Sequence, residues 1–139
     1  MRVRVAGVTE PQPTPPTSDD RQGEPPHVAD LQDNVRDLAD VPSVEVISRA
    51  AVMLMSASAE KLGLASEDPD TAPERDLDEA RRLITALAGL VSASVEYLGA
   101  HAGPIRDGLQ TLQRAFREAS AIPDPPGQGP GEKYTGPVY

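Results

Sequence analysis

Apolar residues recur at helical spacing in four segments of this chain, and proline or glycine separates the segments. The first segment starts at residue 28 and stops before Pro42, which disfavours a helical conformation in the residue before it. Its apolar residues follow heptad spacing: Val28, Leu31, Val35 and Leu38. The second begins with Ser43 as its cap and ends at Gly63, a residue suited to the left-handed turn after a helix. The pattern predicts one helix over each segment.

The second and third segments carry apolar residues on two faces. In the helix expected over 43–62, one face holds Ile47, Ala51, Leu54, Met55 and Leu62, and the other holds Val46, Ala50, Met53 and Ala57. The helix expected over 77–98 follows a capping box formed by Asp76 and Glu79. Its two faces hold Leu77, Ala80, Ile84, Leu87, Val91 and Leu98, and Leu83, Ala86, Leu90, Ala93 and Tyr97. Both helices are therefore expected to have neighbours on two sides.

The last segment carries a single apolar stripe. It starts near Pro104, which the first turn of a helix tolerates, and it stops before Pro123. Its stripe consists of Ile105, Leu109, Leu112, Phe116 and Ala119. Two-faced helices belong at the centre of a fold and one-faced helices at its edge. The sequence therefore predicts an all-α small helical bundle built on a central antiparallel helical hairpin, or two hairpins paired in a dimer.

The two ends of the chain differ from its middle in composition. Both are rich in proline and poor in apolar residues, so they cannot offset the entropy cost of ordering. We expect a disordered Pro-rich arm over 1–27, a helical domain over 28–121 and a disordered Pro/Gly-rich tail over 122–139. The tail nevertheless ends in a tyrosine-containing element, with two of the four aromatic residues of the chain, Tyr134 and Tyr139.

Charge and composition disfavour several classes of function. The formal net charge of −9 opposes nonspecific contact with nucleic acid or with an anionic membrane. The chain has no cysteine for a disulfide, a thiolate nucleophile or a cysteine metal site. Its longest apolar runs fall short of the roughly 20 residues that cross a bilayer, so we expect a cytoplasmic protein without membrane contact. A small domain with few aromatic residues also gains stability by self-association, which predicts a homo-oligomer.

The acidic stretch between the central helices is the candidate for metal binding. Asp68, Asp70 and Glu79 match positions one, three and twelve of a calcium-binding loop. Pro73 occupies the position at which that loop requires glycine. We therefore interpret the stretch as a solvated linker and predict no metal site.

No pattern of residues predicts catalysis or a cofactor. His27 lies at the edge of the Pro-rich arm, and His101 lies in a turn rich in glycine and alanine. The chain contains no nucleophile elbow, no phosphate-binding glycine loop and no paired histidines on a helix. We expect a protein that is not an enzyme.

Two groups of residues are candidates for contact with a partner. Lys133, Tyr134 and Tyr139 lie in the tail, where tyrosine can stack on a partner or fill its pocket. In the alternative, both tyrosines fold back over leucines of the bundle. The second group lies on one side of the last helix: Arg106, Arg114 and Arg117. Acidic residues flank this group, which argues against RNA contact and is typical of a solvent-exposed helix face; contact with an acidic protein is the alternative.

The stretch VEVISRAAVMLMSASAEKLGL followed by DLDEARRLITALAGL resembles the bacterial family called domain of unknown function 1844. The similar features are a helix that ends in Leu62 and Gly63, a short acidic linker, and a second helix that opens with Asp76 and Leu77. The resemblance covers about residues 44–120, and the ending EKYTGPVY is similar to the actinobacterial branch. In that branch, the gene lies near those for translation initiation factor three and two large-subunit ribosomal proteins, which implies a link to translation.

We therefore expect a non-catalytic helical interaction protein that binds a protein of the translation machinery and uses its tail as a docking peptide. Two alternatives remain open. The chain could be a self-associating structural module, or it could bind a small ligand between its helices.

Overall fold

Three long helices form the framework of the protein. In a computed structural model, residues 38–139 are described, and Asp40–Tyr139 form one unit. The long helices are α2 (Ser43–Lys61), α3 (Leu77–Leu98) and α4 (Ala102–Ala119). The shorter elements are the 3-10 helices η3 (Pro69–Thr71) and η4 (Gly99–His101), and the four-residue helix α5 (Glu132–Thr135). The predicted arm over 1–27 and residues 28–37 of the predicted first helix lie outside the described residues.

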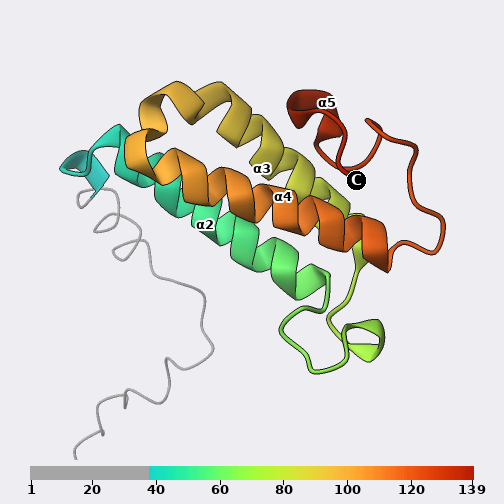
Figure 1. The fold of residues 1–139 in the computed structure, drawn as a ribbon. Helices are drawn as coiled ribbons and strands as arrows, with labels where there is room; N and C mark the ends of the chain where they lie inside the picture. Colours follow the sequence, from blue (N-terminus) through green and yellow to red (C-terminus); the bar gives the residue numbers. More distant parts are fainter. Residues whose placement is uncertain (1–37) are drawn as a thin grey trace, which may run out of the picture. The chain divides into compact units, whose positions relative to one another are not determined.

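The all-α bundle and its central hairpin are confirmed. The described part of the chain contains helices and no strand. As Figure 1 shows, α2 and α3 run antiparallel, and α4 returns along them and packs against both. The tail follows α4 and places α5 against α3 (Figure 1).

Local sequence signals set the ends of α2 and α3. Pro42, rather than Ser43, occupies the cap position of α2, and its carbonyl accepts from the N–H of Glu45 at 3.0 Å. Gly63 has φ +78°, and a Cβ there would lie 2.8 Å from the carbonyl oxygen of Pro69. Glycine is therefore required both by the backbone conformation and by the close approach of the linker. At the start of α3, the Asp76 carboxylate accepts from the N–H of Glu79 at 3.1 Å, which confirms the predicted cap.

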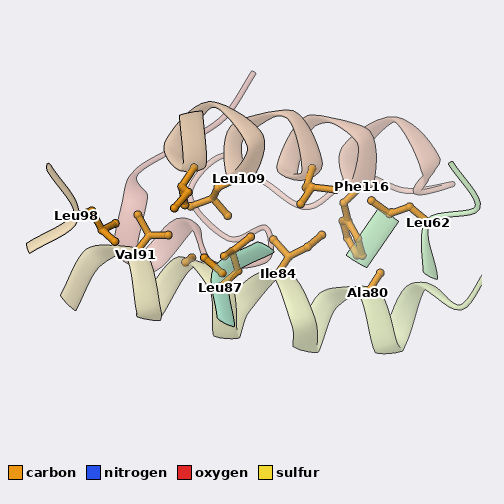
Figure 2. Packing of buried hydrophobic residues seen from close by; sticks show 12 residues of the cluster. Leu62, Ala80, Ile84, Leu87, Val91, Leu98, Leu109 and Phe116 are labelled. Atoms are coloured by element: carbon orange, nitrogen blue, oxygen red, sulfur yellow. The ribbon is translucent and has the colours of Figure 1, made fainter. Parts of the chain in front are cut away.

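The core lies between the three helices. Figure 2 shows Leu109 and Phe116 of α4 pointing toward Ile84 and Leu87 of α3. The predicted stripe of α4 is buried at four positions: Ile105, Leu109, Leu112 and Phe116. Full burial of a leucine or phenylalanine side chain contributes about 1.5–3 kcal/mol, so this stripe explains why α4 docks on the hairpin. By length and composition alone, Leu77–Ala119 also meets the criteria for a membrane span, a test that the core helix of a soluble protein passes as well.

The prediction that α2 and α3 are buried on two faces is wrong for α2. Its first face packs inward, with Ala51 buried and Leu54 partly buried, but Met53 on the second face is 73% exposed. On the second face of α3, Leu83 and Leu90 are partly buried, whereas Ala86, Ala93 and Tyr97 are exposed. The reason is that α4 packs against the same side of both helices. The opposite side of the hairpin has no neighbour among residues 40–139.

Arg75 fixes the linker between α2 and α3. Its guanidinium donates hydrogen bonds to the carbonyl of Pro69 at 3.0 Å, to the carboxylate of Asp70 at 2.7 Å and to the carbonyl of Ala119 at 2.9 Å. The last carbonyls of a helix lack partners within the helix, and a cation there also complements the helix dipole. The predicted solvated linker keeps Asp68 and Asp70 exposed, but Arg75 ties it to the end of α4.

Candidate functional site

The predicted disordered tail is ordered in the structure, and this expectation is corrected. Residues 127–138 pack against α3 and α4. Val138 and Glu132 are buried, the latter with only 6% of its surface exposed. Composition suggested disorder because the tail is poor in apolar residues. The structure orders it instead through backbone hydrogen bonds, a buried carboxylate and close contacts at glycine.

Glu132 holds the tail in its shape. Its Oε1 accepts hydrogen bonds from the N–H groups of Gly127 and Val138, both at 3.0 Å. These donors lie five residues before and six residues after it, so one carboxylate closes the segment into a loop. Gly129 lies directly against the other carboxylate oxygen, where a Cβ would collide with it. We call residues 127–138, with Glu132 at their centre, the tail clasp.

The tail clasp rests on a small area of α3 and α4. Gln113 of α4 is 2% exposed, and its Nε2 donates to the carbonyl of Pro130 at 3.1 Å and to Oγ1 of Thr135 at 3.0 Å. Gly131 has φ +74° and lies against Cβ of Ala88, with no space for a side chain. Ser92 of α3 donates to the carbonyl of Tyr134 at 3.4 Å. We call this area the tail seat: Ile84, Ala88, Gly89 and Ser92 of α3, and Gln113 of α4.

The connecting segment, residues 120–126, is held by interactions of Asp124 with two arginines. Asp124 forms an ion pair with Arg81 at 2.9 Å, and its backbone carbonyl accepts from Arg117 at 3.0 Å. The Arg81 guanidinium also lies 4.9 Å from the centre of the Phe116 ring. In contrast, Ile122 is exposed to solvent. This segment therefore buries no large apolar side chain.

The tail tyrosines do not anchor the tail. Tyr139 is 81% exposed and Tyr134 is 49% exposed. One edge of the Tyr134 ring lies near Gly89, and the ammonium group of Lys133 lies 5.1 Å from the ring centre. The tail returns to its own bundle, as one alternative expected, but Glu132 and Val138 are the buried anchors. Tyr139 remains largely exposed to solvent, and Tyr134 is about half exposed.

The structure brings the two predicted groups of partner-binding residues together. Tyr139 of the tail and Arg114 and Arg117 of α4 line one hollow of about 370 Å³. Tyr134 and Arg106 line a second, larger hollow of about 600 Å³. The walls of the larger hollow also include Val91 and Val95 of α3, Gln110 and Gln113 of α4, and Pro137 and Val138 of the tail. Each hollow thus combines arginine from α4 with tyrosine from the tail.

The residues that build this surface were not predicted from the sequence. Gln113 offered the clearest signal, because it is four residues after Leu109 and three before Phe116 and so lies on the buried side of α4. A polar residue at such a position requires hydrogen-bond partners. Glu132 and Gly131 gave no comparable signal, because their roles depend on contacts that sequence spacing does not encode.

The other candidate side chains of residues 38–139 are His101 and the acidic residues of the linker. Within residues 38–139, no three histidine or acidic side chains converge on a metal site. His101 lies exposed on η4. Asp68 accepts from the backbone N–H of Asp70, and Asp70 pairs with Arg75, so both carboxylates have partners in the linker. The larger hollow offers cationic, amide, carboxylate and aromatic groups beside apolar walls, and the smaller one offers cationic, carboxylate and aromatic groups.

Comparison with known families identifies the helical core. Residues 43–118, more than half of the chain, match the family model described as domain of unknown function (DUF1844). Comparison with curated proteins and with solved structures found no match. The matched range covers α2, α3 and nearly all of α4, and it ends before the tail clasp. The chain therefore belongs to the DUF1844 family of domains of unknown function.

Proposed function

We propose that this protein is a non-catalytic, cytoplasmic interaction protein that binds another protein through the surface formed jointly by α4 and the tail. The observation that carries the proposal is the shared hollow of Tyr139, Arg114 and Arg117. Tyrosine and arginine are enriched where protein interfaces are strongest. The clasp strengthens the argument, because a docked tail presents Tyr139 from a fixed backbone and lowers the entropy cost of binding.

The charges favour a protein partner with an acidic patch. Arg106, Arg114 and Lys133 are exposed on or beside the two hollows, whereas the whole chain carries a net charge of −9. Attraction to these cationic side chains directs an acidic partner to this face. The net negative charge of the whole chain disfavours its binding elsewhere. RNA remains the less favoured partner, because the net charge of −9 opposes a polyanion whose phosphates extend beyond the two hollows.

We place the partner in the translation machinery, on the basis of the gene neighbourhood that the actinobacterial resemblance implies. The test is co-sedimentation of the purified full-length protein with ribosomes at low and high salt. Wild-type protein should co-sediment, and Tyr139→Ala together with Arg114→Ala should reduce the bound fraction at least fivefold. Ile122→Ala is the matched control, because Ile122 is an exposed apolar side chain that lines neither hollow.

Two results would contradict this proposal in different ways. If wild-type protein does not co-sediment at any salt concentration, the ribosome is not the partner. If the double variant co-sediments as well as wild type, binding does not use the α4 and tail surface.

Self-association is a second candidate function, and a separate observation favours it. Val46 and Met53 of α2 and Tyr97 of α3 are exposed, although they belong to helical faces with an apolar pattern. Pairing two hairpins through these faces would bury them in a four-helix arrangement. Light scattering on the full chain tests this: wild type should have the mass of an oligomer, and Met53→Glu should shift it to the monomer. A monomeric wild-type protein would rule out this function.

A further inference from the structure

We infer that the tail seat is a peptide-binding site whose ligand is residues 127–138, and that it accepts this segment from a second copy of the chain as well as from its own. The inference concerns the buried side of the tail, whereas the proposed function concerns its exposed side. Each can therefore fail without the other.

The first argument is that the tail clasp holds its own shape. The Glu132 carboxylate binds two N–H groups of the clasp itself, from Gly127 and Val138. The backbone turns are equally local: the N–H of Glu132 donates to Gly129, that of Tyr134 to Gly131, and that of Gly136 to Glu132, at 2.8–3.0 Å. None of these bonds involves α3 or α4. A segment with this much internal bonding is a preorganised ligand and loses less entropy on binding.

The second argument is that the seat recognises the clasp by a few specific contacts. Gln113 donates two hydrogen bonds from a nearly fully buried amide, one to the carbonyl of Pro130 and one to the hydroxyl of Thr135. Gly131 fits against Ala88 only because it has no side chain, and Val138 is buried at the far end of the clasp. The seat therefore recognises glycine at 131 and threonine at 135 at a fixed spacing, which is sequence-specific recognition of a peptide.

The third argument is that none of the contacts between clasp and seat requires the two to belong to one chain. The connecting residues 120–126 bury no large apolar side chain, and Ile122 in that segment is exposed. They are held by Arg81 and Arg117, which both contact Asp124. A clasp from another copy would form the same hydrogen bonds and bury the same atoms. Exchange of identical elements between copies is a low-cost route to a dimer.

The intramolecular clasp has one advantage, which is its high effective concentration. For a short linker this is on the order of millimolar, so the chain's own clasp occupies the seat unless it is weakened or the protein is concentrated. The site should therefore be hidden in the wild-type chain and exposed in variants that cannot dock their own tail.

The experiment uses a fluorescein-labelled peptide with the sequence of residues 127–139 and measures its anisotropy on titration with full-length protein. The receiving chains are wild type and two variants with weakened clasps, Gly131→Val and Glu132→Ala. Both variants should bind the peptide at least tenfold more tightly than wild type, whose own clasp competes. Adding Gln113→Leu to either variant should weaken peptide binding at least tenfold, because the seat then loses both hydrogen bonds to the clasp.

The matched control on the ligand is the same peptide carrying Gly131→Val, which should not bind. Far-UV circular dichroism confirms that each receiving chain is helical, and two different weakened chains guard against misfolding of one. The inference is overturned if neither helical variant binds the wild-type peptide. It is also overturned if Gly131→Val in the peptide leaves binding unchanged, because the interaction is then not the one made by the clasp.

Discussion

The helical core and the tail clasp are ordered by different kinds of interaction. The core buries apolar side chains at regular spacing, such as Ile84, Leu87 and Leu109, and tolerates small shifts because the hydrophobic effect has no direction. The clasp buries one large apolar side chain, Val138, and depends on Glu132 with its two donors. Hydrogen bonds depend on direction, and a glycine contact leaves no space for a side chain. Loss of one acceptor or addition of one Cβ should therefore weaken the clasp. The comparison teaches that a segment with few apolar residues can be ordered when a neighbouring helical surface already exists.

The largest effect is expected from a cavity in the core. Leu87→Ala removes a fully buried side chain and should lower the free energy of unfolding by about 3 kcal/mol. The matched control is Ile122→Ala, at an exposed position in the connecting segment, which should change stability by less than about 0.5 kcal/mol. Urea unfolding followed by circular dichroism measures both. Equal midpoints would contradict the assignment of the core.

The next effect separates the tail clasp from the core. Gly131→Val places a branched side chain at φ +74° and against Ala88, and should cost the docked tail about 2–3 kcal/mol. Hydrogen exchange should accelerate at residues 127–138 but not in the buried part of α3. Gly136→Val is the control, because φ there is +89° but no atom lies within 4 Å of the added Cβ. If both variants release the tail equally, backbone strain alone is responsible and contact with the seat is not.

A smaller effect is expected from the buried carboxylate. Glu132→Ala leaves the N–H groups of Gly127 and Val138 without their acceptor, which should destabilise the docked tail by about 1–2 kcal/mol. Glu132→Gln should retain part of this stability, since its amide oxygen still accepts a hydrogen bond. Hydrogen exchange of the Val138 amide reports the difference. Protection of that amide in the alanine variant at the wild-type level would rule out the role of Glu132.

The smallest effect is expected from the ion pair in the connecting segment. Asp124→Asn removes the charge that faces Arg81 but leaves the backbone carbonyl that binds Arg117. Both side chains of the pair are partly exposed, so the loss should be at most about 0.5 kcal/mol and should vanish at high salt. Urea unfolding at two salt concentrations measures it. A loss above 1 kcal/mol that is independent of salt would mean that Asp124 anchors the tail as strongly as Glu132.

The sequence by itself determined the helices and their core. Apolar spacing, the cap at Asp76 and the glycine at position 63 predicted the bounds of α3 and the end of α2 closely, because these signals act within a few residues. Membership in DUF1844, which covers the same helices, also follows from that pattern. The six predicted partner-binding residues were chosen for their residue types. The sequence did not predict that the tail group and the α4 group line the same hollows.

Only the tertiary structure decided where the tail lies. Gln113 meets Pro130 and Thr135 only after the tail has docked on α4, and Glu132 meets Gly127 and Val138 only when the tail turns back on itself. Tyr139 and Arg114 also meet only in the folded chain. They line one hollow, although they lie 25 positions apart in the sequence and belong to segments of different composition. Composition measures how much apolar surface a segment can bury, and on that measure the tail resembles a disordered one. Its order comes instead from a few directional contacts with a surface that other residues build, and such contacts have no sequence period.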